Sequence, residues 1–489
     1  MSLNKTDILA GLQCEKHLFL RKNHPERAKI NDSPAALTGR VVQEHARRVF
    51  PGGVLVERHR RDVDPLAQTR QLMEDPSIQT IFEAGFRYQN DQEALEAFVD
   101  VLERTKQGWV LTEIKSGTRV QDKHIDDVTI QALILARSGI PITRYNLMHI
   151  NPDFRYQGDH DYSQLFLREN ITDSVRAHLA DIASRLSDLE LLVSAQEPVK
   201  QIGSHCKNPF PCPFMRYCES IGPRYPVYGL PNGADAARKL IGQGIIDIRD
   251  IPPDFLTSET QQRVRNITIQ GKAELLPEAR HILTALEFPR YYLDFECMQF
   301  AIPIWKDTRP YDQLPFQWSC HVESADGTLM HAEFLDTSGD DPRYAFAQAL
   351  LDECGSQGPI IVYNQAFEKR IIRELARTFP KLSRSLLALN ERMFDLLPVV
   401  RKYYYHPDMK GSWSIKKVLP CLVPELRYEA LGVVQDGTMA QAVYLDIIHE
   451  GVSEKRKDQL RLDLLAYCGL DTLAMVKIVE KLQQIPESV

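Results

Sequence analysis

The sequence predicts an α/β protein with more than one domain. Its 489 residues correspond to two to four domains of ordinary size. Runs rich in β-branched and aromatic residues, typical of strands, alternate with runs in which apolar residues recur three and four apart, as in helices. The strand-like runs lie at 97–102, 108–116, 291–297 and 360–363, and helix-like runs lie at 129–136 and 464–475.

The composition limits the classes of protein to which this chain can belong. A hydrophobic content of 43% with 26% charged residues is ordinary for a soluble globular protein, and the net charge of −7 provides no basic field for nonspecific coating of nucleic acid. The first residues lack an apolar signal region, and no run approaches 18 apolar residues. We therefore expect a cytoplasmic protein with no membrane contact and with reduced cysteines.

Two neighbouring strands of the N-terminal part carry a first group of polar residues. Asp100 lies on the first strand, and the second presents Glu113 and Lys115 on one face because side chains alternate along a strand. Such a set can hold one or two metal ions beside a cation that acts on a phosphate. A lone Glu-x-Lys is usually a surface ion pair, but here His45 precedes the strands and Gln131 follows them on an amphipathic helix.

Four of the nine cysteines form a second feature of this part. Cys206, Cys212 and Cys218 lie close together, and Cys14 stands alone near the N-terminus. In a reducing compartment, four such thiolates are typical of metal ligands rather than disulfides. Prolines at 209, 211 and 213 favour a knuckle over a helix. A tetrahedral zinc site is one interpretation, with His205 or His17 able to replace a cysteine.

The ordered set of His45, Asp100, Glu113, Lys115 and Gln131 resembles the RecB-like branch of the PD-(D/E)XK nucleases. The resemblance implies a restriction-endonuclease-like α/β core over 1–224, with His45, Asp100 and Glu113 as metal ligands and Lys115 and Gln131 as catalytic residues. In iron–sulfur members of the branch, one cysteine before the core and three after it hold a 4Fe-4S cluster. The resemblance therefore implies such a cluster on Cys14, Cys206, Cys212 and Cys218, although the spacing C-x5-C-x5-C departs from the usual C-x2-C-x5-C, and zinc remains the alternative.

Residues 225–285 are expected to form a helical connector between two domains. A turn-rich exit precedes a short helix at 234–244, a strand-like run at 245–251 and further helical segments. A glycine-containing stretch within it weakly resembles a helix-hairpin contact to nucleic acid. A plain spacer is the favoured interpretation.

The C-terminal third carries a second set of carboxylates. Asp294 and Glu296 lie two apart on a strand and therefore share a face, where they repel each other unless a cation lies between them or the face is solvated. Glu368 begins a helix after a strand and a turn at Asn364. Tyr467 and Asp471 lie one turn apart on a later helix.

This pattern resembles the DEDD exonucleases of the RNase H-like (DnaQ-like) superfamily, in their tyrosine subclass. The resemblance implies a mixed-sheet α/β domain over 286–489 that binds two Mg²⁺ or Mn²⁺ ions, with Tyr467 orienting the attacking water. Glu368 stands where the family usually has Asp, so Asp395 is a competing second-motif ligand. The implied metal ligands are Asp294, Glu296, Glu368 and Asp471.

Cations and aromatic rings interleave in the segment 401–417. This combination is typical of a surface that binds single-stranded nucleic acid through phosphate contacts and base stacking. The alternative is a solvated charge run beside a buried aromatic cluster. The candidate contacts are Lys402, Tyr404, Lys410, Trp413, Lys416 and Lys417.

Together these resemblances cover nearly the whole chain and imply a fusion of two nuclease domains. We expect a metal-dependent nuclease that acts on DNA, preferably single-stranded DNA or DNA ends, with 3′-to-5′ exonuclease activity and, by analogy, a role in repair, recombination or defence. Two alternatives remain. One is an exoribonuclease that uses the C-terminal centre alone, and the other is a catalytically silent scaffold that binds nucleic acid.

Overall fold

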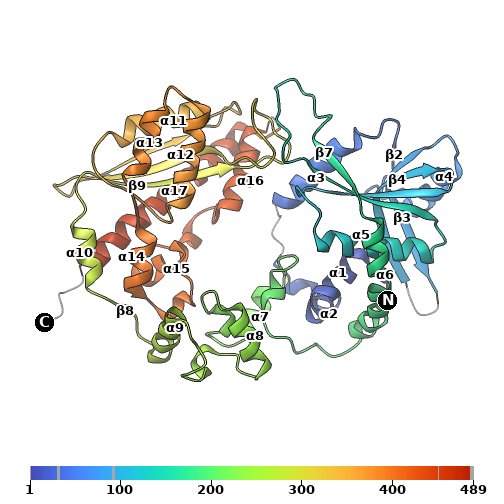
Figure 1. The fold of residues 1–489 in the computed structure, drawn as a ribbon, viewed down its shortest axis with the longest axis horizontal. Coiled ribbons are helices and arrows are strands. Elements are labelled where there is room, and N and C mark those ends of the chain that lie inside the picture. Colours follow the sequence, from blue (N-terminus) through green and yellow to red (C-terminus); the bar gives the residue numbers. More distant parts are fainter. Residues whose placement is uncertain (1, 30–33, 91–93, 450, 485–489) are drawn as a thin grey trace. The chain divides into compact units, whose positions relative to one another are not determined.

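The computed structural model describes residues 2–29, 34–90, 94–449 and 451–484. The chain forms two compact units (Figure 1): Met1–Gly222 with Phe300–Tyr311, and Pro223–Gln299 with Asp312–Val489. Both units combine helices with a β-sheet, as the α/β pattern predicted. Within the described residues, no helix is long and apolar enough to cross a membrane.

The first unit is built on a seven-stranded sheet in the order β2-β3-β4-β5-β6-β7, and β1 also pairs with β4. The three strands β3, β4 and β5 form an antiparallel meander, whereas β5 and β6 are parallel. A parallel pair requires a crossover connection, which α5 (Asp122–Arg137) supplies. The strands are β1 (Ser2–Asn4), β2 (Val54–Leu55), β3 (Thr80–Gln89), β4 (Ala94–Thr105), β5 (Gly108–Lys115), β6 (Ile142–Ile150) and β7 (Phe166–Asn170).

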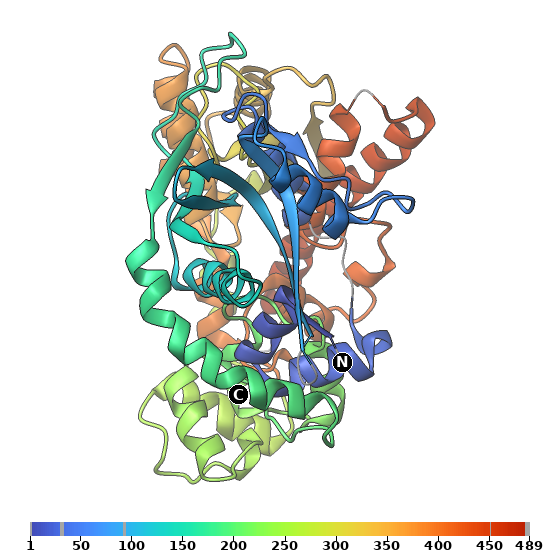
Figure 2. The ribbon, with the colours of Figure 1, turned by 90° about the vertical axis from the view of Figure 1, so that its right-hand side faces the viewer.

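Helices cover this sheet in layers. The helix α5 packs on β3, β4 and β6, and α6 packs against α5 (Figure 2). The apolar face of α5 is fully buried against sheet residues such as Leu111 and Leu147, which explains its amphipathic pattern. The other helices of the unit are α1 (Lys5–Gln13), α2 (Glu15–Asn23), α3 (Pro34–Arg47), α4 (Pro65–Glu74), α6 (Thr172–Val193) and α7 (Met215–Ile221).

The second unit contains a mixed five-stranded sheet in the order β11-β10-β9-β12-β13. Its strands β9, β10 and β11 are antiparallel, and β12 and β13 run parallel to β9. Alternate residues of β9 pack on opposite sides: Leu293 and Phe295 contact the core under α11 to α13, whereas Tyr292 belongs to the core that contains α17. The strands are β9 (Arg290–Met298), β10 (Leu314–Glu323), β11 (Leu329–Leu335), β12 (Ile360–Val362) and β13 (Met393–Asp395).

The expected connector folds as part of this second unit. Its buried residues, including Leu240, Val264 and Leu283, share one hydrophobic core with residues of α14 and α17. The run 245–251 is not a strand as predicted; it contains a 3-10 turn at Ile248–Asp250, where the Asp247 side chain accepts a hydrogen bond from the Arg249 amide. The segment is therefore a structural layer of the unit rather than a spacer.

The remaining elements of the second unit complete this layer and the two faces of the sheet. They are α8 (Ala234–Gly242), α9 (Glu259–Gln270), β8 (Glu274–Leu275), α10 (Glu278–Thr284), α11 (Arg343–Cys354), α12 (Ala366–Thr378), α13 (Ser383–Glu391), α14 (Leu396–Tyr403), β14 (Tyr404–Tyr405), α15 (Ile415–Leu422), α16 (Gly437–Ile448) and α17 (Glu454–Gln483).

Candidate active sites

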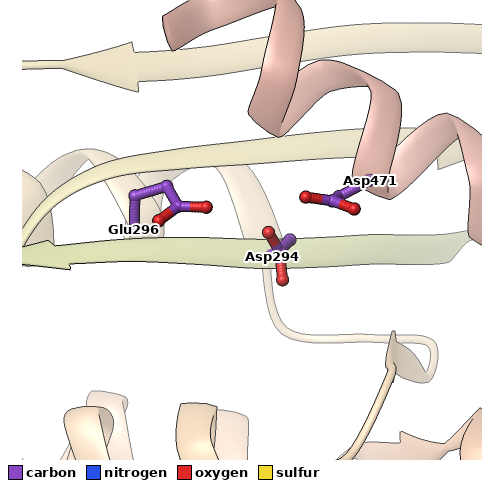
Figure 3. Close-up of side chains that lie close together, drawn as sticks. All are labelled: Asp294, Glu296 and Asp471. Carbon is purple, nitrogen blue, oxygen red and sulfur yellow. The ribbon is translucent and has the colours of Figure 1, made fainter. Parts of the chain in front are cut away.

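A cluster of three carboxylates lies between β9 and α17 in the second unit. Asp294 and Glu296 project from the strand toward Asp471 on the helix (Figure 3). Ligand oxygens of the three side chains all lie within 4.8 Å of one another. Among the described residues, no other set of three or more carboxylate, imidazole or thiol groups meets that distance.

Local structure explains this convergence. The period of two along β9 directs Asp294 and Glu296 to one face while Leu293 and Phe295 enter the core on the other. On α17, Tyr467 and Asp471 are one turn apart, and both are buried at 4% and 7% exposure. The two local patterns recognised in the sequence therefore meet at one place.

The three carboxylates repel one another, so the cluster favours binding of a cation or of protons. Burial and repulsion by Asp471 raise the pKa of Asp294 well above its usual range and that of Glu296 to about 8. Burial also raises the pKa of Asp471 to about 6, although hydrogen bonds and Lys416 act in the opposite direction. A divalent ion would relieve this repulsion, because hard carboxylate oxygens are the ligands that Mg²⁺ and Mn²⁺ prefer.

Glu368 and Asp395 differ sharply in their surroundings. Glu368 is 2% exposed, and its Oε2 is buried without a hydrogen-bond partner. Burial raises its pKa to about 8, and its charge also raises the pKa of Asp294. Asp395 instead accepts backbone hydrogen bonds from Asn364 at 3.0 Å and from Leu397 at 3.1 Å, so it caps α14 and fixes the turn. Glu368 is thus the carboxylate with oxygen available to a ligand.

Two further side chains contact Tyr467 and Asp471. Lys416 Nζ donates a hydrogen bond to the Tyr467 hydroxyl at 2.9 Å and lies 4.8 Å from the centre of its ring. The Tyr428 hydroxyl donates to Asp471 Oδ1 at 2.5 Å. The sequence interpretation missed Tyr428, which lies in a 3-10 turn without a motif, and assigned Lys416 to a different surface.

The aromatic residues of 401–417 do not form the expected stacking surface. Tyr404 and Trp413 are 2% and 5% exposed, and Trp413 Nε1 donates to the Tyr404 carbonyl at 2.9 Å. Their rings belong to the core of the second unit, so neither can stack on a base. The cations Lys402, Lys410 and Lys417 are exposed, and the structure therefore matches the alternative of a charge run beside buried aromatics.

The first unit brings Asp100 and Glu113 to one pocket of about 480 Å³, together with Lys115. Asp100 lies on β4, where its Oδ2 accepts a hydrogen bond from the Ile114 amide of β5 at 2.7 Å. Gln43 Nε2 donates to Asp100 Oδ1 at 3.0 Å. Burial and the nearby Glu113 raise the pKa of Asp100 to about 8.

Two lysines neutralise the other carboxylates of this pocket. Lys115 Nζ lies 2.7 Å from Glu113 Oε1 and 2.5 Å from Asp127 Oδ2. Lys5 Nζ bridges the same pair at 3.1 and 2.8 Å. Gln131 Nε2 donates to Glu113 Oε2 at 2.8 Å, so Gln131 belongs to this network. Lys5 and Asp127 were missed, although Asp127 and Gln131 are one helical turn apart.

His45 does not join this network. Residues two apart on a helix differ by about 200° in direction, so Gln43, which contacts Asp100, and His45 project from opposite sides of α3. The His45 Nδ1 lies 3.0 Å from the Val41 carbonyl, and its ring packs edge-on against Tyr162. The structure therefore places His45 away from the hydrogen bonds of Asp100, and its role as a metal ligand stays a prediction.

The four cysteines line one small pocket, as their sequence positions predicted. Cys14 separates α1 from α2, and Gln13 fixes this junction by donating to the His205 and Phe210 carbonyls at 2.7 and 2.6 Å. Burial raises the pKa of the Cys212 thiol to about 11 and also that of Cys206. The sulfurs do not form a group within 4.8 Å in the described structure.

Comparisons with known proteins find similarity to a domain of unknown function and to uncharacterized proteins. A model of the domain of unknown function DUF2779 matches residues 291–414. The chain is 24% identical over 247 residues to the uncharacterized protein UU173 of Ureaplasma parvum and 27% identical over 212 residues to the uncharacterized MG366 homolog of Mycoplasma pneumoniae. These matches cover 46% and 40% of the chain and only 36% and 32% of the relatives, so the chain spans about a third of their length. The matched family region contains Asp294, Glu296 and Glu368 but ends before Tyr467.

Proposed function

We propose that this protein is a metal-dependent nuclease with two hydrolytic centres, one in each unit, and that its substrate is DNA with single-stranded ends. The convergence of Asp294, Glu296 and Asp471 within 4.8 Å carries the proposal. These carboxylates, of which Glu296 and Asp471 are buried, come from a strand and a helix at least 175 residues apart in sequence, and a plain structural site would leave their repulsion without compensation. The choice of DNA and of 3′-to-5′ trimming rests on the family resemblance.

The residues of the second unit suit two divalent ions. Asp294, Glu296, Asp471 and Glu368 would hold Mg²⁺ or Mn²⁺, and the orphan Oε2 of Glu368 supports its inclusion. Bound ions would supply an activated water and stabilise the leaving oxygen. Tyr467 would orient that water, because Lys416 fixes its hydroxyl through the hydrogen bond at 2.9 Å.

The first unit supports a second centre, in which lysines contact the carboxylates. Asp100 and Glu113 face one pocket beside Lys115, and Gln131 holds Glu113. Here Lys5 and Lys115 already compensate Glu113 and Asp127. We therefore infer that a metal ion at this centre would compete with Lys5 for Glu113.

We also propose a 4Fe-4S cluster on Cys14, Cys206, Cys212 and Cys218. The proposal is supported by the one-plus-three order of these cysteines around the core, which resembles that of the iron–sulfur members of the RecB-like branch, and by the pocket that all four thiols line. A zinc ion held by the same four thiols is the alternative.

The decisive experiment measures Mn²⁺ binding by calorimetry and digestion of end-labelled single-stranded DNA with the full chain. We expect Asp294→Asn to abolish trimming of a 5′-labelled strand and to weaken Mn²⁺ binding, whereas Asp458→Asn, an exposed change on the same helix as Asp471, leaves both unchanged. We expect the loss of this one carboxylate ligand to slow trimming by at least about a hundredfold, at about 1.4 kcal/mol for each tenfold. Unaltered Mn²⁺ binding by Asp294→Asn would exclude the proposed centre, and matched RNA strands would reveal an exoribonuclease instead.

A further inference from the structure

A second and larger pocket lies beside the first unit's candidate centre. Its volume is about 1020 Å³, and it is bounded by α1, α2 and the cysteine loop. Its walls include three prolines, at 25, 211 and 213, which give them a fixed shape.

The pocket is strongly cationic although the chain as a whole is acidic. Among the described residues that line it, four have basic side chains and one has an acidic side chain: Arg21, Lys22, Lys29 and Arg216 against Asp7. The difference, four minus one, is three positive charges. Neither Lys29 nor Arg216 forms an ion pair with any residue in the described part of the chain, and both are exposed.

Asp7 holds two of these cations in place. Its side chain is 3% exposed, and it accepts from Arg21 Nε at 2.7 Å and from Lys22 Nζ at 3.2 Å. Asp7 also accepts from the Asn4 amide in the cap of α1, so the carboxylate itself is fixed. One carboxylate cannot neutralise two cations, and the pocket therefore presents preorganised positive charge.

The cationic pocket and the pocket of the candidate centre share a lining residue. Asn4 lines both pockets, and the next residue, Lys5, contacts Glu113 at 3.1 Å. On its other side, Cys212, Phe214 and Met215 line both the cationic pocket and the cysteine pocket. The cationic pocket therefore shares lining residues with both the candidate centre and the cysteine pocket.

We infer that the cationic pocket binds the phosphodiester backbone of a single nucleic-acid strand that continues past Asn4 to Asp100 and Glu113. This inference rests on the proposed nuclease function of that centre. Several cations that line one pocket can bind the phosphates of a strand, because phosphate contacts dominate the affinity of proteins for single-stranded nucleic acid. A pocket of about 1000 Å³ takes a ligand of a few rings, which corresponds to a short run of nucleotides.

The test measures binding without cleavage. Fluorescence anisotropy of a fluorescein-labelled single-stranded 20-mer is followed in EDTA, across a range of salt concentrations, for the full chain and for the double variant Lys29→Ala/Arg216→Ala. Because each lost phosphate contact reduces the salt slope by about 0.7, we expect the slope to fall by about 1.4 and the affinity at low salt to fall about tenfold. The control is Lys106→Ala/Arg144→Ala, which removes two exposed cations elsewhere in the first unit.

Each outcome tests whether the cationic pocket binds a strand, independently of whether the protein cleaves it. Equal affinity and equal salt slope for the Lys29/Arg216 variant and the wild-type chain would overturn it, as would an equal loss in the control. A melting temperature unchanged from wild type shows that the variant is folded. If the variant loses binding while the wild-type chain fails to cleave with Mn²⁺ or Mg²⁺, the strand-binding pocket stands and the proposed nuclease function fails.

Discussion

Lys416 donates a hydrogen bond to the hydroxyl of Tyr467 at 2.9 Å, at the edge of the carboxylate cluster of the second unit. Lys416 also donates to the Gln435 carbonyl at 2.8 Å, so the ammonium group is held on two sides. Its charge lowers the pKa values of Glu296 and Asp471, against the larger effect of burial. Lys416 therefore links the position of the tyrosine to the protonation of the carboxylates.

Replacing Lys416 by Met should slow Mn²⁺-dependent cleavage by about tenfold, equivalent to about 1.4 kcal/mol. Removal of the cation raises the pKa values of Glu296 and Asp471, so these groups would ionise and bind metal only at higher pH. We therefore expect the rising limb of the rate against pH to move to higher pH. The control is Lys417→Met, which changes an exposed neighbouring lysine. If the pH dependence of the rate is the same for Lys416→Met and the wild-type chain, Lys416 does not act on the carboxylates.

Replacing Glu368 by Gln should stabilise the metal-free protein at alkaline pH. The folded-state pKa of Glu368 is about 8, above the unfolded value of about 4.5, so the folded protein binds the extra proton between these values. Binding of that proton contributes fully to the free energy of unfolding below pH 4.5, and this contribution is lost as the pH rises through 8. The neutral amide avoids this loss.

The measurement for Glu368→Gln is the melting temperature in EDTA at pH 5 and pH 8.5. We expect a gain of about 3 °C at pH 8.5, corresponding to about 1 kcal/mol, and none at pH 5. Mn²⁺ should stabilise the wild-type chain more than this variant. Glu374→Gln, an exposed change on the same helix, should have no pH-dependent effect. A gain that is equal at both pH values would contradict the ionisation argument.

Replacing Lys5 by Met should destabilise the first unit, because Glu113 and Asp127 would then share only Lys115. Breaking a partly buried ion pair leaves a carboxylate without compensation. The double variant Lys5→Met/Asp127→Asn removes both charges and should recover part of the lost stability. We expect a coupling free energy of about 1 kcal/mol or more in denaturant unfolding.

The control for that cycle pairs Lys5→Met with Asp126→Asn. Asp126 is the adjacent residue on α5 and contacts His178 instead of Lys5. We expect this double variant to recover none of the stability that Lys5→Met loses. Equal recovery by both double variants would mean that the bridge between Lys5 and Asp127 has no specific energetic role.

Replacing Cys206 by Ser should remove iron from protein purified without oxygen. For a 4Fe-4S cluster we expect about four iron and four sulfide ions per chain and a broad absorbance near 400 nm in the wild-type chain. The Ser variant should lose both and melt at a lower temperature, since the pocket joins the ends of the first unit. Cys421→Ser, outside the pocket, should retain them. One zinc ion per chain in place of iron would overturn the cluster proposal.

Much of both candidate sites could be predicted from local sequence periodicity. Alternation along β9 predicted the shared face of Asp294 and Glu296, and one helical turn predicted the shared face of Tyr467 and Asp471. These relationships follow from the fixed geometry of strand and helix, which a chain adopts over a few residues. The one-plus-three arrangement of cysteines likewise predicted their shared pocket.

Only the tertiary structure decided which of several compatible residues reach each site. Lys5 lies 108 positions before Glu113, and Tyr428 lies 43 before Asp471, and no local period relates either pair. The orientation of α3 places Gln43, and not His45, beside Asp100. Tyr404 and Trp413 are buried in the core of the second unit and do not face solvent. Such choices depend on which apolar faces pack together, because burial of apolar surface is non-directional and a sequence pattern does not specify its partner.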